Sequence, residues 1–459
     1  MKKILIIAAI LITNNFYGQE HFAGLNTSSR VGILTAAMNP AELTNMSSQF
    51  EVNIIGASVN VSNNKIGFSD LTSDSNIEDL IFIGDKPVNM RFDVEVLGPG
   101  LAMKYKKWAF GITSKANGKL NIIDVDTKLG DAISNSGLNS LISSTNINNK
   151  NNQRIIGTTW GEIDLILART FLDTQVHKFN GGLTFKLLFP GSYANLGADS
   201  FNGTISQTAG QGFLTNTNAN LNFSYSGSLA SSFSNFDDYT QSVFGGLNGF
   251  AGDIGFNYQW KDEKGLGTSI NGNKSNKNKY RLNAGVSIRN IGSMTFKDNN
   301  NNSTNYTLQI QGTESLNLNQ FENVDSLQEV ENILLNSGYL TKTSSNKDFK
   351  VQLPTTLTLY TDVKLLPILY TSVYLQQKMN DDSANDQITA QNIFTLTPRL
   401  TLGLFEAYIP FSNSEISGFA TGIGFSYGGF YIGSGSAITA MLNDSKQADM
   451  YLGFRWGFL

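Results

Sequence analysis

The sequence has no cysteine and only two histidines, His21 and His177, in 459 residues. Without cysteine there is no disulfide scaffold, no Cys-ligated zinc or iron–sulfur site and no thiol nucleophile. A lipid-anchored lipoprotein is excluded as well, because its anchor is attached to an N-terminal cysteine. Two histidines leave little room for a His-rich metal site or for His-based catalysis, so we expect neither a metal nor another cofactor.

Charge is also scarce. Lys, Arg, Asp and Glu make up 15% of the residues, against about 25% in an ordinary soluble domain. The net charge of −4 gives no basic excess that could neutralise phosphates, which argues against a nucleic-acid partner. Glycine and phenylalanine are abundant instead, at 44 and 30 residues. This combination favours a long β-sheet with one side facing a membrane.

Long apolar runs are missing outside the first residues. The run at residues 4–12 is too short for a helix that spans a bilayer, which needs about 20 residues. It follows Lys2 and Lys3 and precedes a polar stretch that ends at Gly18, so we expect residues 1–18 to be a cleaved signal peptide. The alternative is a buried N-terminal strand. With a signal peptide, the exported protein is either soluble or a β-barrel in the outer membrane.

Alternation of apolar and polar residues decides between these two. At the C-terminus one face carries Met450, Leu452, Phe454, Trp456 and Phe458, and the other carries Asp449, Tyr451, Gly453, Arg455 and Gly457. Residues 250–260, 280–289 and 351–365 repeat the pattern, which is typical of transmembrane β-strands. A sandwich core could not bury so many charges without a heavy desolvation cost. A polar lumen can hold them.

The charged and polar residues expected to face the lumen occur on strand after strand. They are Asp93, Glu95, Glu162, Asp164, Lys178, Lys186, Asp253, Arg281, Arg289, Asp362 and Arg455. The pairs Asp93/Glu95 and Glu162/Asp164 could do acid–base work or bind calcium. We favour a structural role, in which these acids and the later bases form a charged ladder across the lumen.

The pattern predicts an all-β fold, a transmembrane antiparallel barrel of about 14 strands over residues 51–459, with both ends on the periplasmic side. Counts of 12 or 16 strands stay open. Short turns are expected on the periplasmic side, among them 397–399 between strands 386–397 and 400–410, and 428–429. The polar residues 261–278 fall on that side too, although they are long. On the other side lie long extracellular loops with helices at 127–142 and 316–337.

One strand changes its apolar parity halfway. Phe92, Val94 and Val96 are even-numbered, whereas Leu101 and Met103 are odd-numbered. Between them stand Gly98, Pro99 and Gly100, and proline within a sheet is confined to bulges and edges. We therefore predict a bulge there, and a kink of the barrel wall.

Residues 19–50 precede the first strand and do not alternate. This segment is rich in small and apolar residues, and we interpret it as a hatch that folds inside the barrel. Its Asn39-Pro40-Ala41 resembles the Asn-Pro-Ala motif in the hatch of the FadL family of outer-membrane barrels. Ser287-Ile288-Arg289-Asn290-Ile291-Gly292 resembles a strand-end segment of FadL-like barrels of the Bacteroidota, including PorV-type proteins.

The resemblance implies a fold and two kinds of function. FadL-type proteins carry hydrophobic compounds through a lateral opening in the barrel wall, and the hatch gates the lumen. PorV-type barrels serve as partners of a secretion machine. Only Asn39 and Pro40 can be carried over as hatch positions, and a plain helix start is an equal reading of that pair.

An enzyme is the least favoured reading. Gly424-Phe425-Ser426-Tyr427-Gly428 matches the nucleophile-elbow motif, but that motif works on a sharp strand-to-helix turn and here lies within a predicted strand. We therefore expect an outer-membrane barrel in contact with lipid that transports a small hydrophobic compound. The alternatives are a non-transporting scaffold of a secretion or envelope-assembly complex and, third, an outer-membrane hydrolase.

Overall fold

The computed structural model describes residues 21–71, 80–134, 144–208, 211–230, 246–261, 280–297, 301–442 and 444–457. The expected signal peptide, most of the 261–278 connection and Phe458 lie outside these ranges. Within them, no helix is long and apolar enough to cross a bilayer.

Strands dominate the described chain. They are β1 (Phe50–Asn63), β2 (Val88–Tyr105), β3 (Trp108–Val125), β4 (Ser144–Asn149), β5 (Gln153–Asp173), β6 (His177–Thr208), β7 (Gln211–Ser226), β8 (Gly249–Lys261), β9 (Tyr280–Phe296), β10 (Asn302–Ile310), β11 (Leu316–Asn317), β12 (Leu340–Asn346), β13 (Phe349–Gln352), β14 (Thr356–Lys364), β15 (Leu369–Lys378), β16 (Ile393–Leu402), β17 (Phe405–Tyr408), β18 (Phe411–Ser414), β19 (Gly418–Thr421), β20 (Ile423–Tyr427), β21 (Phe430–Ser434) and β22 (Gln447–Trp456). The helical elements are η2 (Gly32–Ala37), η3 (Pro40–Asn45), α2 (Phe68–Leu71), α4 (Thr127–Ser134), η4 (Ser228–Ala230), η6 (Leu318–Phe321), α6 (Leu327–Asn336) and α7 (Ala437–Leu442).

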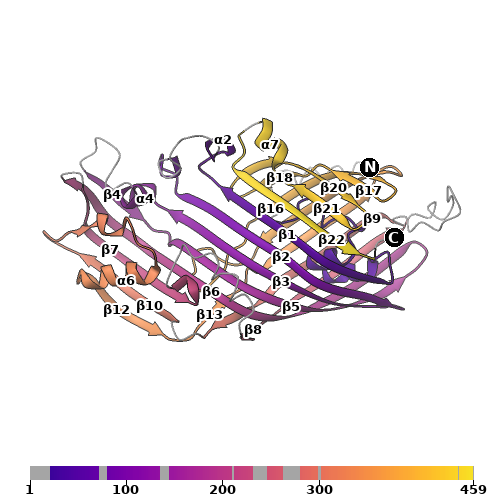
Figure 1. Ribbon diagram of the computed structural model, residues 1–459, viewed down its shortest axis with the longest axis horizontal. Coiled ribbons are helices and arrows are strands. Elements are labelled where there is room, and N and C mark those ends of the chain that lie inside the picture. The colour runs from indigo at the N-terminus through magenta and orange to yellow at the C-terminus, as the bar shows by residue number, and fades with distance from the viewer. Residues whose placement is uncertain are drawn as a thin grey trace.

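The wall is a closed antiparallel barrel of 14 strands, as predicted (Figure 1). Each wall strand pairs with the next along the chain, and β1 pairs with β22 to close the ring. Two wall positions are interrupted, because β16 pairs with both β17 and β18, and these pair with β20 and β19. Closure leaves no free strand edge in the wall, which is the condition for a sheet to span a membrane.

The outside of the wall is apolar and the inside is polar. In β22, Leu452 is 42% and Trp456 68% exposed, whereas Tyr451 is 1% and Arg455 3% exposed. Strand β8 repeats this, with Phe250 and Phe256 exposed outside. The predicted alternation is confirmed for both strands, and it gives the barrel the outward apolar band of a transmembrane β-barrel.

Arg281 is a correction to the predicted lumen residues. Its side chain is on the outer face, where the guanidinium lies 5.6 Å from the centre of the Trp260 ring. The register shifts at this point, because Trp260 pairs with Leu282 and Lys261 pairs with Tyr280. Arg281 is the extra residue of a bulge, which reverses the parity and turns Tyr280 inward instead.

The turn predicted at 397–399 is also wrong. Pro398 lies inside β16 opposite Thr371 of β15, and the chain turns at Gly403, whose φ is +61°. The neighbouring strand is interrupted between β17 and β18 at that level, so the missing N–H of Pro398 leaves no gap in a ladder. Residues 386–392, predicted as strand, belong to the connection that precedes β16.

The short-turn side of the barrel agrees with the predicted topology. Gly428 at the β20–β21 turn donates its N–H to the Leu404 carbonyl at the neighbouring turn, 3.1 Å away. Lys261 and Tyr280, which flank the long polar connection, pair at the same end, where Lys261 N donates to the Val176 carbonyl at the β5–β6 turn. The 261–278 connection therefore starts and ends on the side where the count placed it.

On the other side the wall extends well beyond the barrel. The far half of β6 pairs with β4 and β7, β7 pairs with β10, and β10 pairs with β12 (left of Figure 1). Helices α4 and α6 pack on this sheet through one apolar cluster that includes Phe223 and Leu334. The helical spacing in 316–337 is thus confirmed, with Ser326 as the N-cap of α6. The predicted long loops thus contain the strands of this β-extension.

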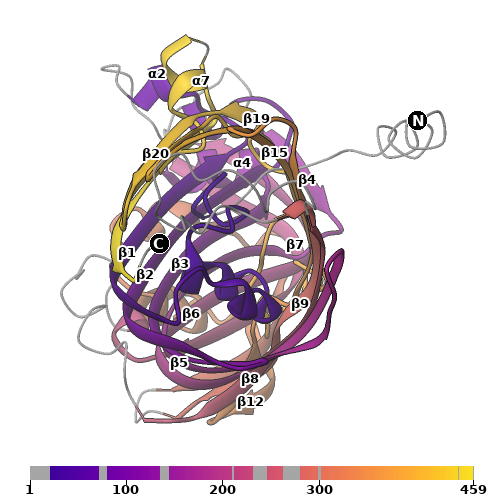
Figure 2. The same ribbon diagram turned by 90° about the vertical axis from the view of Figure 1, so that its right-hand side faces the viewer.

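The N-terminal segment, residues 21–49, lies inside the barrel (Figure 2). Its helical turns η2 and η3 are enclosed by the ring of strands, and η3 contacts β3, β5, β6 and β8. Leu25 and Leu43 are completely buried, and each contributes roughly 1.5–3 kcal/mol by leaving water. The apolar side chains of this segment, which does not alternate like a strand, are thus buried inside the barrel.

Candidate functional site

Asn39 joins the N-terminal segment to three wall strands. Its Nδ2 donates to the carbonyls of Phe256, at 2.9 Å, and Val286, at 3.3 Å, and to the Tyr360 hydroxyl, at 3.1 Å. Its Oδ1 accepts from the Ala41 N–H at 3.0 Å and so caps η3. The predicted helix start is thus present, and the residue that caps the helical turn also attaches it to the wall.

Pro40 lies against a flat strip of the wall that two glycines create. A Cβ on Gly182 would be 2.5 Å from the carbonyl carbon of Pro40, and one on Gly255 would be 2.0 Å from Asn39 Oδ1. Both contacts are far below ordinary van der Waals distance, so only glycine lets the backbone of the segment approach the sheet so closely.

Glu42 is a functional candidate that sequence reasoning missed. Its buried carboxylate accepts from Asn257 and Asn283, each at 2.8 Å, from Asn45 at 2.7 Å and from the Tyr360 hydroxyl. The spacing Asn39-x-x-Glu42 matches a capping box, in which the glutamate would turn back to the cap. Here it reaches the barrel wall instead, and no pattern within the segment could indicate that.

A second attachment is built on buried charges. Arg399 and Asp362 are fully buried, and Arg399 Nη2 lies 2.6 Å from Asp362 Oδ2. Glu406 lies 3.6 Å from both Arg399 and Arg30, and it accepts from the Ser28 hydroxyl at 2.9 Å. Asp362 was predicted to face inward, but Arg399 was missed because it was assigned to a turn.

Arg455 and Glu51 form a third attachment. Arg455 Nη1 lies 3.4 Å from Glu51 Oε2, and its Nη2 donates to the carbonyl of Arg30. Glu51 also accepts from the N–H of Ile33 at 2.9 Å. The predicted inward residue Lys178 adds a contact to η3, donating to Asn45 Oδ1 at 2.7 Å. The N-terminal segment is therefore bound to the wall by polar contacts at both of its helical turns.

The remaining charges form cross-strand pairs in the middle of the lumen. Asp93 lies 2.8 Å from Lys119, Asp164 3.5 Å from Lys115, and Lys186 lies 3.5 Å from Glu162 and 3.2 Å from Asp253. Acids and bases of neighbouring strands thus neutralise one another. Lys115 and Lys119 were absent from the sequence-based set, although they share one face of β3.

A cavity of about 100 Å³ lies beside these pairs, in the middle of the lumen. Its polar lining includes Glu95, Lys115 and Arg289, and its apolar lining includes Phe22 and Leu34 of the N-terminal segment. Arg289 is positioned by the Ala37 carbonyl at 3.1 Å and by Gln376 Oε1 at 2.6 Å. The cavity is therefore bounded on one side by the N-terminal segment.

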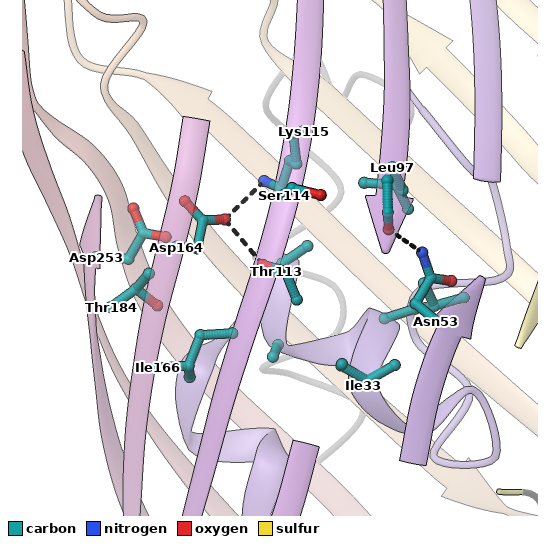
Figure 3. Close-up of a pocket in the computed structure, with 14 residues that line it drawn as sticks. Ile33, Asn53, Leu97, Thr113, Ser114, Lys115, Asp164, Ile166, Thr184 and Asp253 are labelled. Carbon is teal, nitrogen blue, oxygen red and sulfur yellow. Dashed lines mark hydrogen bonds and ion pairs between the residues drawn. The ribbon is translucent and has the colours of Figure 1, made fainter. Parts of the chain in front are cut away.

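A smaller cavity of about 20 Å³ reaches the wall at the predicted kink (Figure 3). Between Leu97 and Gly100, β2 has one residue more than its partner β3, so Gly98 and Pro99 form a bulge. Asn53 donates to the Gly98 carbonyl at 2.8 Å and Ser114 to the Pro99 carbonyl at 2.9 Å. Strand β1 has its own irregularity beside it, between Asn53 and Ile55.

The two cavities are neighbours. Both are lined by Leu34 and Ala37 of the N-terminal segment and by Leu97 and Lys115 of the wall. In Figure 3, Ile33 and Leu97 lie on one side of the smaller cavity, and Asp164, held by Lys115 and Thr113, lies on the other. A continuous row of residues thus leads from the lumen to the bulge.

Ser426 does not lie on the strand-to-helix turn that a hydrolase nucleophile needs. Ser426 lies in the extended strand β20, and the following Gly428 leads into β21, not into a helix. His21 pairs with another serine, since its Nδ1 lies 2.9 Å from Ser58 Oγ, and His177 contacts the Tyr258 hydroxyl at 2.7 Å. Among the described residues, no group of three or more His, Asp or Glu is placed to hold a metal ion.

Comparison with known proteins shows a match to one protein family. The profile of a family described as "Family of unknown function (DUF5723)" matches residues 40–435. No curated protein matches the sequence.

Solved structures similar to the chain include outer-membrane channels. A mutant of the monoaromatic hydrocarbon channel TodX has 10% identity and a TM-score of 0.49 over 97% of this chain and 99% of that chain. The Pseudomonas putida toluene transporter TodX has 10% identity and 0.43 over the same shares. A Pseudomonas aeruginosa FadL homologue has 10% identity and 0.33 over 97% of this chain and 100% of that chain. The relation to PorV-type barrels and to the Bacteroidota stays a prediction.

Proposed function

The chain belongs to DUF5723, a family of unknown function, and we propose that it is a FadL-like outer-membrane channel for small hydrophobic compounds. The observation that carries this proposal is the row of cavities between the N-terminal segment and the bulge at Gly98 and Pro99. An apolar solute could leave the lumen through these two cavities and enter the membrane laterally at the bulge, without crossing the N-terminal segment.

The smaller cavity has one apolar side that could contact an apolar solute. Ile33, Leu34, Leu97 and Ile166 present aliphatic side chains there, whereas Lys115, Asp164 and Asp253 line the side that faces the lumen charges. In the present state it holds only about 20 Å³, which is room for a single water molecule. Passage therefore requires η2 to move away from the bulge, and this is the gating role that we propose for the N-terminal segment with Asn39 and Pro40.

The proposed location is the outer membrane, reached through the cleaved signal peptide of residues 1–18. The closed wall and its exposed belt of Phe, Leu and Trp side chains support it, because such a surface is stable only in lipid. The proposal includes no enzyme activity and no cofactor. Its small-molecule partner is apolar, and lipid surrounds the wall.

The bulge gives the test. Deletion of Pro99 would remove the extra residue of β2 and restore a regular ladder with β3, whereas Pro99→Ala keeps the residue count and serves as the matched control. We expect cells that produce the Pro99 deletion to lose uptake of toluene, while Pro99→Ala retains it, with glucose as the polar control solute. Equal toluene uptake by a correctly folded deletion variant and the wild type would contradict the lateral path.

A scaffold for a secretion or envelope-assembly complex is the second candidate. The β-extension favours it, because β10 is the one partner of β12 among the described residues, and residues 341–346 of β12 are exposed. Such an edge can accept a strand of a partner protein. Co-purification of envelope proteins with the wild type, lost when residues 340–346 carry a strand-breaking proline, would support this role over transport.

A further inference from the structure

The connection from β15 to β16, residues 379–392, folds back into the barrel. Ile388, Thr389, Ala390 and Gln391 are all at most 4% exposed, which is unusual for a connection. Loops normally run over the surface because their backbone groups need water or partners. The burial of this connection therefore requires dedicated partners within the barrel.

These partners come from strands around the ring. Asn121 of β3 donates to Thr389 at 2.9 Å, Gln391 donates to Ser62 of β1 at 2.9 Å, and Ile388 donates its N–H to the Gln352 carbonyl at 3.0 Å. Ser62 and Asn121 lie at the ends of their strands that lead into the long connections. Residues 379–392 thus cross the lumen near its extracellular mouth.

Arg154 is the strongest of these partners. Its side chain is completely buried, and it donates from Nη1 to the Asp382 carbonyl at 2.7 Å and from Nη2 to the Gln387 carbonyl at 3.0 Å. Its Nε is held by Asn195 of β6 at 3.0 Å. A guanidinium that binds two carbonyls five residues apart fixes the shape of the loop between them.

Tyr193 of β6 makes a similar contact with the loop. Its hydroxyl donates to the Asn385 carbonyl at 2.9 Å, between the two carbonyls that Arg154 binds. The two bonds from Arg154 Nη1 and Nη2 and the bond from the Tyr193 hydroxyl end on loop carbonyls. None of them is needed to close the ladder of the wall, where Arg154 and Tyr193 already pair through their own main chains. The wall can therefore stay intact when the loop leaves.

We propose that residues 379–392 are a second plug, at the extracellular mouth, and that Arg154 is the positioning residue that latches it. The cavity of about 100 Å³ in the lumen, here called the central cavity, is lined by Ala390 of this loop and by Phe22 and Leu34 of the N-terminal segment. It therefore lies between two plugs in series. A solute from outside reaches the cavity only after the loop has moved. This device is independent of what the channel carries.

The absence of cysteine from the chain makes the plug directly testable. Thr356 lines the central cavity and is 2% exposed, and within the described part of the chain its hydroxyl has no hydrogen-bond partner, so Thr356→Cys places a thiol there without breaking a described contact. In intact cells a sulfonated thiol reagent that does not cross lipid reaches this thiol through the extracellular mouth or, after passing through porins, past the N-terminal segment. Of the two plugs, the one that Arg154 holds is the loop at the mouth. A rise in the labelling rate on substitution of Arg154 then reports opening of the loop.

We expect Thr356→Cys with Arg154→Ala to label about tenfold faster than Thr356→Cys alone, since a hydrogen bond from a charged donor is worth at least a factor of about ten. Arg169→Ala is the matched control, because Arg169 is on the same strand but stacks on Trp108 at the outer face. It should leave the rate unchanged. Tyr193→Phe removes one neutral bond and should give a smaller increase.

Folding is checked by the mobility shift between heated and unheated samples on gels. Should Arg154→Ala fail to fold, Tyr193→Phe decides alone. Equal labelling rates of folded Arg154→Ala or Tyr193→Phe and of the Arg169→Ala control would overturn the plug. Faster labelling together with no toluene uptake would retain the plug and reject the apolar cargo.

Discussion

The close approach of Pro40 to the wall predicts that Gly182→Ala destabilises the protein through the N-terminal segment. The new Cβ would stand 2.5 Å from the Pro40 carbonyl carbon and the Ala41 nitrogen, both backbone atoms that cannot rotate away. To restore a 3.4 Å contact, η3 must move by about 0.9 Å. The Asn39 bond to the Phe256 carbonyl would lengthen from 2.9 Å to about 3.8 Å and be lost.

The magnitude follows from these two effects. Overpacking costs about 1–3 kcal/mol, and the lost hydrogen bond adds about 1 kcal/mol, so the free energy of unfolding should fall by about 2–4 kcal/mol. Gly118→Ala is the matched control in the wall, because its Cβ would meet only a Thr159 methyl at 4.0 Å. That change should be neutral or slightly stabilising, since alanine restricts the unfolded chain.

The assay is urea unfolding of the full-length protein in detergent micelles, followed by tryptophan fluorescence and by the folded band on unheated gels. Trypsin provides a second measurement, because Arg30 lies within the N-terminal segment with 14% of its side chain exposed and becomes a cleavage site once the segment is released. A Gly182→Ala protein as stable and as protease-resistant as the Gly118→Ala protein would refute the idea that this contact holds the segment.

Two further substitutions compare a buried ion pair with an exposed one. Asp362→Asn should lower the free energy of unfolding by up to about 3–5 kcal/mol, because it removes the nearer of the two counter-charges of the fully buried Arg399 and leaves only Glu406 at 3.6 Å. Asp173→Asn in an exposed pair should change it by less than about 1 kcal/mol, and the same urea titration compares the two variants. In the β-extension, burial and the nearby Glu331 carboxylate raise the pKa of Tyr306. The neutral phenol therefore contributes fully to stability below the unfolded pKa of about 10, and this contribution is lost as the pH rises further. The stability of the β-extension, followed by phenolate absorbance and circular dichroism, should fall above that pH. It should fall less in Tyr306→Phe.

How far the sequence predicts this fold depends on whether a residue acts within its own strand. The alternation in β8 and β22 is a local property, and it predicted strands, faces and topology. The bulge at Gly98 and Pro99 was predictable as well, because proline and the change of parity lie next to each other in the chain. The bulge at Arg281 has no such signal, and parity alone placed its side chain in the lumen.

The residues that were missed act across the lumen. Glu42, Arg399 and Arg154 all bind groups on elements far away in sequence, and their own neighbours in the chain give no indication of the partner. Pro398 was taken for a turn because proline usually interrupts a strand, and only the gap between β17 and β18 makes it acceptable inside one. That gap belongs to another strand, so its effect on Pro398 is a property of the closed barrel.

The connection 379–392 shows why the position of a loop is harder to predict than its existence. Its composition is polar, with Asn380, Asp381 and Asp382 in sequence, which is typical of an exposed surface loop. Its inward course depends on Arg154, a residue that period-2 alternation marks only as facing inward on β5. An inward arginine in a polar lumen can pair with an acid of the wall or with backbone carbonyls of a loop. The wall acids Asp93, Asp164 and Asp253 are engaged with Lys119, Lys115 and Lys186, whereas Arg154 finds its acceptors on the carbonyls of Asp382 and Gln387 in the connection. The course of this loop therefore depends on a buried cation whose partners lie more than 200 residues away in the chain.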